Sequence, residues 1–357
     1  MAYKEVVADA TVAGFFILHL PSFGESIRME SSSTIRFTAQ KMCYTLGGFM
    51  EFTTLIMDCG ELQGEHQSEN QYPSFLKDLL INLKKIHINV IELSQYEQAK
   101  KTIHSLVEWL QDQHAKPENC LLLTTSDKTL AMISSMPIAA IGYRHEANQT
   151  EELWDADMLI EENELKNSFE EIDLKFLERV FCRKHGIPWT ISQTSRCTLR
   201  EMTLEDLEDL YAIYQDKDIT RYMENLYERE KEERYTKNYI EQIYHFYGFG
   251  MWIVVETVSG RIIGRAGLNV TRIRDESLLE MGYMICKEYQ NKGYATEACK
   301  AVLAFAKSDT AFLQVNCFIQ KENGISIHIA DKFGFVWKEE LLLDGKMMQR
   351  YIKILHE

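Results

Sequence analysis

The sequence predicts an α/β protein built from two consecutive domains. The chain has 357 residues, of which 45% are hydrophobic, so it can bury two separate cores. Strand-like and helix-like segments alternate through its first half, a pattern typical of a parallel sheet covered by helices. A helical pattern over residues 173–185 then stops at a Gly-Ile-Pro sequence, and a short polar connector follows at residues 191–195. We therefore expect one domain over residues 1–190 and a second over residues 197–357.

The first of these domains is expected to be a Rossmann-like α/β unit. Its short apolar runs have the length of strands, and the patterns between them have helical periodicity. Strands are expected over residues 53–57, 86–93, 119–124, 138–142 and 157–160, and helices over residues 73–85, 94–114, 127–136 and 173–185. Residues 1–51 fit no element and stay unassigned.

The most informative part of the second domain is a turn between a strand and a helix. A strand-like run over residues 278–286 leads into the turn, and an apolar-periodic helix over residues 296–307 follows it. The turn consists of Gln290, Asn291, Lys292, Gly293, Tyr294 and Ala295. Backbone N–H groups at the start of a helix are unpaired and carry partial positive charge, so such a turn suits a phosphate or pyrophosphate. An ordinary strand-to-helix turn would explain the same residues.

The sequence after this turn extends the pattern. A short strand is expected at residues 312–318, followed by Asn323, Gly324 and Ser326 and by a helix over residues 327–332 that ends in Phe-Gly-Phe. In this order of features, residues 197–355 resemble the GNAT family of acetyl-CoA-dependent N-acyltransferases, most closely the RimJ/RimL type that acetylates ribosomal-protein N-termini. The resembling segments are TLREMTLEDLEDLYAIY (198–214), WIVVETVSGRIIGRAGL (252–268), LLEMGYMICKEYQNKGYATEACKAVLAFA (278–306) and VNCFIQKENGISIHIADKFGF (315–335). The resemblance implies an α+β domain with a mixed, mainly antiparallel sheet.

The resemblance also implies how acetyl-CoA would be held. Backbone amides from Gln290 to Thr296 would bind the pyrophosphate, and the turn glycine would let the backbone approach it closely. The strand edge at Tyr283, Met284 and Ile285 would pair with the pantetheine arm, as an added strand pairs with a sheet. Asn323 matches the family asparagine that contacts this arm. A plain Asn-Gly turn with an N-cap serine is an equally good local explanation.

Catalytic candidates follow from what acetyl transfer to an amine requires. The amine must lose a proton, and the leaving thiolate must be protonated or stabilised. Glu280, on the strand before the turn, is the first candidate for the base, although a solvent-facing glutamate would have the same pattern and many family members need no dedicated base. The family usually supplies the acid as a hydroxyl near the helix after Asn323. That helix has no tyrosine, so Ser326, His328 and Tyr351 on the last strand remain as candidates.

The N-terminal half, over residues 52–162, faintly resembles the HAD phosphatase fold through LIMDCGEL (55–62), VIELS (90–94) and PENCLLLTTSDKTLAMISSMPIAAIGY (117–143). HAD enzymes hold magnesium with paired carboxylates, whereas only Asp58 remains at the first motif here. Thr124, Thr125 and Ser126, followed by Asp127, occupy the second. Magnesium requires clustered carboxylate oxygens. We therefore expect a degenerate domain without phosphatase activity, and a HAD-like phosphohydrolase is a remote alternative.

Composition restricts the possible partners and location. The net charge is −15, with 18 basic and 28 acidic residues in residues 1–196 against 21 and 26 in the remainder. This balance argues against nucleic-acid binding and is compatible with amine substrates, as it is with simple solubility. The eight cysteines include no C-x-x-C pair, so we expect free thiols and no metal site. The apolar run at residues 12–20 is too short to span a membrane and lacks signal-peptide features, which predicts a cytoplasmic protein.

Two segments are expected to form the acceptor cleft. These are residues 216–226, which contain Asp218 and Glu224, and the aromatic run at residues 244–249, whose rings could hold an amine by cation–π contact or simply belong to the core. The leading prediction is an acetyl-CoA-dependent N-acetyltransferase acting on a protein N-terminus or a small amine. A non-catalytic acyl-CoA-binding module is the alternative. The sequence gives no indication of the oligomeric state.

Overall fold

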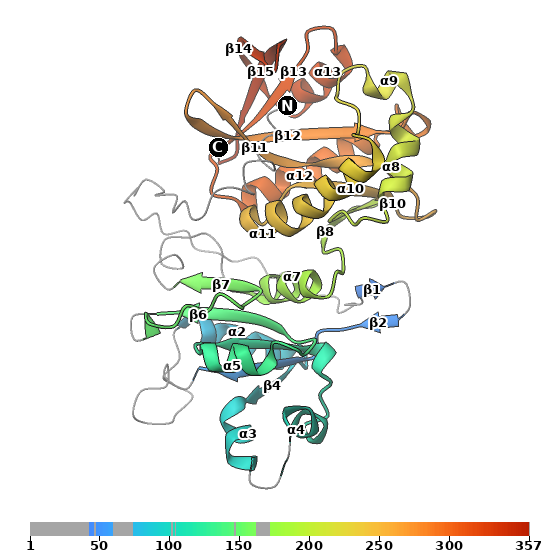
Figure 1. The fold of residues 1–357 in the computed structure, drawn as a ribbon. Helices are drawn as coiled ribbons and strands as arrows, with labels where there is room; N and C mark the ends of the chain where they lie inside the picture. The colour runs from blue at the N-terminus through green and yellow to red at the C-terminus, as the bar shows by residue number, and fades with distance from the viewer. Residues whose placement is uncertain are drawn as a thin grey trace.

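A computed structural model describes residues 43–45, 48–59, 74–100, 103, 105–145, 148–161 and 172–356. Within these ranges the chain forms a five-stranded sheet in its first half, an eight-stranded sheet in its second half and a two-stranded hairpin (Figure 1). The hairpin consists of β1 (Cys43–Thr45) and β2 (Gly48–Met50). It falls in the segment that the sequence left unassigned, and most of that segment lies outside the described residues.

The five-stranded sheet is entirely parallel, which confirms the α/β architecture expected for the N-terminal half. Its strand order is β4-β3-β5-β6-β7. The strands are β3 (Thr54–Asp58), β4 (Asn89–Glu92), β5 (Cys120–Thr124), β6 (Ala139–Arg144) and β7 (Met158–Glu161).

Side chains alternate between two cores on the faces of this sheet. Leu55, Met57 and Leu121 belong to one core with α2 and α7, whereas Ile56 and Leu122 belong to the other with α3, α4 and α5. Strands buried on both faces explain why the sequence shows continuous apolar runs rather than strict alternation. The helices are α2 (Ser74–Lys85), α3 (Leu93–Ala99), α4 (Leu106–Asp112), the 3₁₀ turn η3 (Pro117–Asn119), α5 (Asp127–Ile133) and α7 (Leu174–Lys184).

Two expected elements differ from the structure. The single helix expected over residues 94–114 is two helices, because Ser105 begins a new one: its hydroxyl accepts the N–H of Glu108 at 3.1 Å as an N-cap. The strand expected from residue 86 begins three residues later. His87 has a φ of 62°, a left-handed turn conformation that no strand accommodates.

The eight-stranded sheet has the order β14-β15-β13-β12-β11-β10-β9-β8, and all its pairs are antiparallel except β12 with β13. This is the mixed, mainly antiparallel sheet expected from the sequence. The strands are β8 (Thr190–Gln193), β9 (Cys197–Arg200), β10 (Met251–Glu256), β11 (Ile262–Ile273), β12 (Glu276–Ile285), β13 (Gln314–Ile319), β14 (Val336–Leu343) and β15 (Lys346–Ile354).

Helices cover this sheet and place the turn that opens α12. The turn follows the 3₁₀ segment η6, and α12 buries an apolar face that includes Val302 and Phe305 against the sheet core. None of the described helices is both long and apolar enough to cross a membrane. The helices are α8 (Leu207–Tyr214), α9 (Lys217–Thr220), α10 (Arg229–Asn238), the π-helical turn η5 (Tyr239–Ile243), α11 (Tyr244–Tyr247), η6 (Lys287–Tyr289), α12 (Tyr294–Asp309) and α13 (Gly324–Lys332).

The expected polar connector is part of the second sheet. Strand β8 pairs antiparallel with β9, so the chain enters the sheet before residue 197. Figure 1 shows α7 between the two sheets, and a buried ion pair joins it to the second half: Arg183 Nη2 lies 2.6 Å from Glu201 Oε1, with both side chains 4% exposed.

Candidate active site

The parallel pair of strands β12 and β13 forms an opening in the second sheet. Within residues 172–356, these strands share a single register pair, Glu280 with Asn316. The buried Asn316 fastens this point, because its amide donates to Leu279 O at 3.0 Å and its carbonyl oxygen accepts from Arg350 Nε at 2.9 Å. After Glu280, β12 still pairs with β11 on one side, but its other edge faces no paired strand.

A cavity of about 370 Å³ lies at this opening. Strands β12 and β13, helices α10 and α13, the loop after α9 and the β14–β15 hairpin all contribute to its wall. Its lining residues are Tyr214, Tyr222, Met223, Glu224, Asn225, Leu226, Glu232, Tyr235, Met251, Arg265, Asn269, Glu280, Met281, Gly282, Tyr283, Met284, Cys317, Phe318, Ile319, Gln320, Asn323, Ser326, Ala330, Leu343, Asp344, Lys346 and Met348.

Glu280 lies in the cavity wall at the point where the strands separate. Burial raises the pKa of its carboxyl group, while a hydrogen bond from the Thr271 hydroxyl acts in the opposite direction and the nearby Asp344 adds to the increase. A partly buried carboxylate with one protein hydrogen bond keeps acceptor capacity for a ligand. Such a group accepts a proton more readily than an exposed glutamate does.

Tyr283 and Ser326 come together on the other wall of the cavity. Burial raises the pKa of Tyr283, and the neighbouring Ser326 side chain opposes this effect. The two do not reach hydrogen-bond geometry: the buried Tyr283 hydroxyl donates to no residue in the described part of the chain. A buried hydroxyl without a partner is costly unless a ligand or water satisfies it. The sequence placed Tyr283 among the residues that pair with pantetheine, and its proximity to Ser326 was not foreseen.

Asn323 is the N-cap of α13. Its side-chain oxygen accepts the N–H of Ser326 at 3.2 Å, so the asparagine, and not a serine, caps this helix. This contact leaves the Asn323 amide group on the cavity wall. The capping role and a role in holding a ligand are therefore compatible.

The turn before α12 has the geometry of an anion cradle. Asn291 and Gly293 have φ values of 57° and 86°, and the N–H groups of Tyr294, Ala295 and Thr296 donate to no acceptor among the described residues. Gln290 is different. Its backbone N–H donates to Lys287 O at 3.2 Å, so this amide is already occupied and the cradle begins one residue later than the sequence suggested.

Other predicted residues lie away from the cavity. Tyr351 does not line it, and its hydroxyl donates to Gln349 Oε1 at 3.0 Å. Tyr244, in the aromatic run at residues 244–249, is fully buried and belongs to the core, the alternative that the sequence left open. Asp218 pairs with Lys287 at the surface at 2.5 Å, whereas residues 222–226 do lie at the cavity, as expected.

Sequence reasoning missed several polar residues in the cavity wall, among them Glu232, Tyr235 and Arg265. Glu232 is 4% exposed and accepts the N–H of Tyr227 at 2.7 Å. Burial raises the pKa of Tyr235. The charge-dense sequence of residues 228–234 is typical of a solvated helix face, but positions 232, 235 and 239 recur at helical spacing and face inward. That periodicity is the signal that could have found them.

The carboxylates of the N-terminal half are engaged in structural contacts. Thr124 Oγ1 donates to Asp58 Oδ2 at 2.7 Å, and the Asp127 carboxylate accepts the N–H groups of Glu152 and Leu153 at 2.8 and 2.7 Å. Among the residues that the structure describes, no group of three or more His, Cys, Asp or Glu side chains could hold a metal ion. The parallel sheet is present, but the HAD resemblance receives no support from the comparisons below.

Comparison with known proteins places the second half in a family. Residues 196–336 match the family described as "Acetyltransferase (GNAT) domain". The chain is 27% identical over 152 residues to YkkB of Bacillus subtilis (strain 168), covering 42% of this chain and 86% of that protein. It is 25% identical over 167 residues to a Bacillus licheniformis protein named "Uncharacterized N-acetyltransferase p20", covering 44% and 92%.

Among solved structures, a GNAT-family acetyltransferase from Bacillus anthracis is similar to this chain with 19% identity and a TM-score of 0.39, covering 46% of this chain and 98% of that one. The match to the family itself begins one residue before β9 and extends to the first residue of β14. It therefore includes the turn, the opening between β12 and β13, and α13. Residues 196–336 thus form a GNAT acetyltransferase domain, and the relatives of this part of the chain support an acetyltransferase activity for it.

Proposed function

We propose that this protein transfers an acetyl group from acetyl-CoA to a primary amine, either a protein N-terminus or a small molecule. One observation carries the proposal: the single pairing of β12 with β13. The opening that it creates brings Glu280, Tyr283, Asn323 and Ser326 into one cavity, although the first two come from β12 and the last two from the start of α13. A carboxylate can accept the proton that the amine must lose, and a protonated hydroxyl can donate one to the leaving thiolate.

The residues present fit acetyl-CoA. The open edge of β12 around Tyr283 and Met284 suits the amide-containing pantetheine arm. The carbonyl oxygens on either side are already engaged, that of Met281 by Cys317 Sγ at 3.7 Å and that of Ile285 by Gln290 Nε2 at 2.8 Å. The amides of the turn after Gln290 suit its pyrophosphate, and Asn323 offers its side-chain amide between them. When bound there, acetyl-CoA supplies the activated acetyl group.

Glu280 is the proposed base. Its position in the cavity wall lets it accept the proton of the amine directly or through one water molecule. Because burial raises its pKa, the carboxylate is a stronger proton acceptor than an exposed glutamate. Thr271, the hydrogen-bond donor on the neighbouring strand, fixes its orientation.

Tyr283 is the proposed proton donor to the leaving thiol, with Ser326 beside it. Its raised pKa keeps the hydroxyl protonated throughout the neutral and mildly alkaline range. The absence of a hydrogen-bond partner for this hydroxyl within the described residues leaves its proton available. This assignment fills the role for which the sequence offered no tyrosine on α13.

The acceptor wall of the cavity favours a cationic amine. Glu224, Glu232 and Asp344 place carboxylates on this side, and Tyr214 and Tyr222 add aromatic faces that attract a cation. Carboxylates raise the local concentration of a positively charged amine, which must then lose a proton to react.

A direct test is a screen of small amines and N-terminal peptides with acetyl-CoA, with release of the CoA thiol as the readout. We expect thiol release with at least one class of primary amine, and acetyl-CoA should raise the melting temperature of the protein. A raised melting temperature without thiol release for any amine would favour the non-catalytic acyl-CoA-binding alternative. If acetyl-CoA causes neither thiol release nor a rise in melting temperature, the protein does not use acetyl-CoA and the proposal is wrong.

A further inference from the structure

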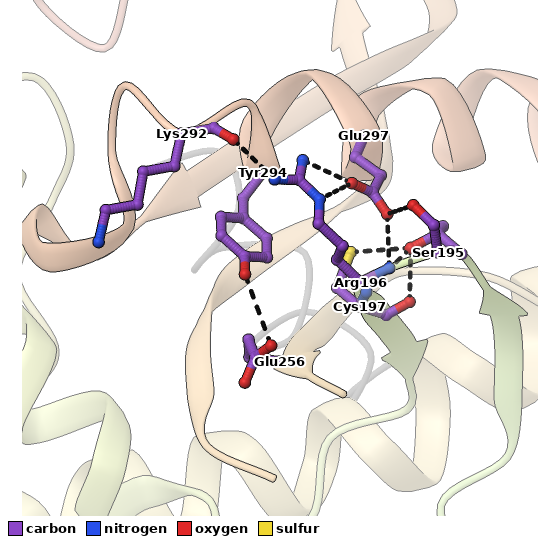
Figure 2. Close-up of polar contacts among 8 residues, drawn as sticks. Ser195, Arg196, Cys197, Glu256, Lys292, Tyr294 and Glu297 are labelled. Carbon is purple, nitrogen blue, oxygen red and sulfur yellow. Dashed lines mark hydrogen bonds and ion pairs between the residues drawn. The ribbon is translucent and has the colours of Figure 1, made fainter. Parts of the chain in front are cut away.

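The side chain of Arg196 lies against the turn that opens α12 (Figure 2). Its Nη1 donates to the carbonyl oxygen of Lys292 at 2.8 Å, and its guanidinium lies 4.4 Å from the ring centre of Tyr294. A Cβ atom on Gly293 would be 3.3 Å from Arg196 Nη2. Lys292 and Tyr294 therefore both contact one arginine, and a side chain at Gly293 would press against it.

The hydrogen bond to Lys292 has a geometric consequence. In a trans peptide the C=O and the following N–H point in opposite directions. Because the Lys292 carbonyl points toward Arg196, the N–H of Gly293 points away from it. The arginine thus fixes the peptide plane between Lys292 and Gly293, directly before the cradle amides of Tyr294, Ala295 and Thr296.

Arg196 is itself firmly held. Its Nε and Nη2 both lie 2.7 Å from Glu297 Oε2, and its backbone N–H donates to Glu297 Oε1 at 2.8 Å. The Ser195 hydroxyl donates to the same Oε1 at 2.9 Å, as Figure 2 shows. Desolvation works to raise the pKa of Glu297, but hydrogen bonds from Thr194, Arg196 and Ser195 outweigh it and lower the pKa to about 2. The carboxylate is therefore ionised at neutral pH.

We propose that Arg196 is a positioning residue for the pyrophosphate of acetyl-CoA: it holds the turn in the conformation that presents its backbone amides. The proposal deepens the function proposed above and rests on it. Arg196 comes from the hairpin between β8 and β9, where the chain enters the second sheet, and not from the strand–turn–helix unit itself. Its contribution concerns the nucleotide half of the donor and not the acetyl group.

Two acetyl donors can test this role, because acetyl-CoA contains the pyrophosphate whereas S-acetylpantetheine carries the thioester without it. For Arg196→Met we expect the KM for acetyl-CoA and the Kd for CoA to rise about tenfold or more, which corresponds to about 1.4 kcal/mol per factor of ten. The kcat with saturating acetyl-CoA, and kcat/KM with S-acetylpantetheine, should stay within about twofold of the unchanged protein. Arg196→Lys should recover little, since lysine lacks the fork that contacts Glu297 and Lys292 together.

Arg272→Met is the matched control. This arginine is exposed and pairs only with Asp275 in the residues described, so its loss should change neither Kd nor KM. If Arg196→Met does not fold, Glu297→Gln takes its place, because it weakens the anchor of Arg196 and should raise the Kd for CoA selectively. An unchanged Kd for CoA, or an equal loss with both acetyl donors, would overturn the proposal. Calorimetric titration with CoA needs no amine acceptor, so a wrong function and a wrong role for Arg196 give different results.

Discussion

Two opposed effects act on the carboxyl group of Glu280, burial and a hydrogen bond. A strand glutamate is most stable in water, yet the opening between β12 and β13 places this carboxyl group in a partly buried wall. Burial favours the neutral form and raises the pKa, whereas the hydrogen bond from Thr271 favours the carboxylate. The balance leaves a group that takes up a proton at a higher pH than an exposed glutamate does, as a base must.

Replacing this group should change the pH dependence of turnover. Because the carboxyl pKa is raised, the reaction of the unchanged protein should slow as the pH falls through that pKa and the base becomes protonated. Glu280→Gln should lower kcat about 100-fold at neutral pH, and less at high pH, where more of the amine is already neutral. Rates measured from pH 6 to 10 check this, with Glu276→Gln at the exposed start of β12 as the control. If the ratio of the rates of Glu280→Gln and the unchanged protein is constant across this range, Glu280 is not the base.

The proton donor can be tested in the same assay. Tyr283→Phe removes only the unpartnered hydroxyl and should lower kcat about 100-fold, with a smaller change in the KM for acetyl-CoA. Ser326→Ala should have a weaker effect, since Ser326 adjoins this hydroxyl without bonding to it. Tyr351→Phe is the control, because its hydroxyl lies outside the cavity and bonds to Gln349. Equal losses in Tyr283→Phe and Tyr351→Phe would contradict the assignment.

At the scale of elements, the turn before α12 depends on one backbone conformation. Gly293 has a φ of 86°, a region that costs a residue with a Cβ atom about 1–2 kcal/mol. Asn291 adopts the same region at 57°, which asparagine tolerates better than most residues. The cradle is thus formed by local backbone geometry, which is why a short sequence pattern was sufficient to suggest it.

Gly293→Ala should therefore weaken CoA binding by about tenfold, and Gly293→Trp should abolish it, because the side chain would enter the space in front of the amides or displace Arg196. A bulky residue at Ala295 should act in the same way. Gly260→Ala is the matched control, since Gly260 has a similar φ of 69° and open space around it, far from any proposed ligand role. Titration with CoA should show a higher Kd for the Gly293 and Ala295 variants than for Gly260→Ala. Equal Kd values would show that the turn does not bind CoA.

Sequence patterns predicted β12 and α12 to within two residues, because each has a strong apolar period and a glycine between them. They failed for residues 94–114, where the helical period continues but Ser105 starts a new helix. They also missed Glu232 and Tyr235. Most residues around them are charged, and only the packing of the folded chain determines which side of this helix faces the cavity. The contact between Tyr283 and Ser326 lay beyond the sequence for the same reason: it joins a strand and a helix whose separation only the fold determines.

At the scale of the whole molecule, α7 joins the two halves. Arg183 on this helix forms its ion pair with Glu201 and also contacts the carbonyl of Gly248 at 3.4 Å. Both charged groups are shielded from water, so neither can be removed without leaving the other unpaired. This contact ties the N-terminal half to the acetyltransferase half at the end of β9.

Arg183→Met should consequently destabilise the protein by about 3–5 kcal/mol, because it leaves the Glu201 carboxylate buried and unpaired. Urea unfolding, followed by separate probes for each half, measures this loss. The neighbouring Lys184→Met is the control: its pair with Asp157 is partly exposed, and its loss should cost at most about 1 kcal/mol. Similar losses of stability in the two variants would show that the ion pair between Arg183 and Glu201 contributes no more than a surface contact.

The pairing of β8 with β9 determines how the two halves can be separated. A fragment that begins at residue 197 loses β8 and leaves Thr198, Leu199 and Arg200 as a bare sheet edge, which invites other chains to add to it. A fragment that begins at residue 187 keeps β8, and Trp189 still accepts the N–H of Glu201 at 2.9 Å. Both fragments lack Arg183, so they differ at this edge only in β8, and we expect the shorter one to aggregate more than the longer one in light scattering. The outermost strand of the acetyltransferase half, β8, therefore lies in a segment whose polar sequence resembles a linker between domains.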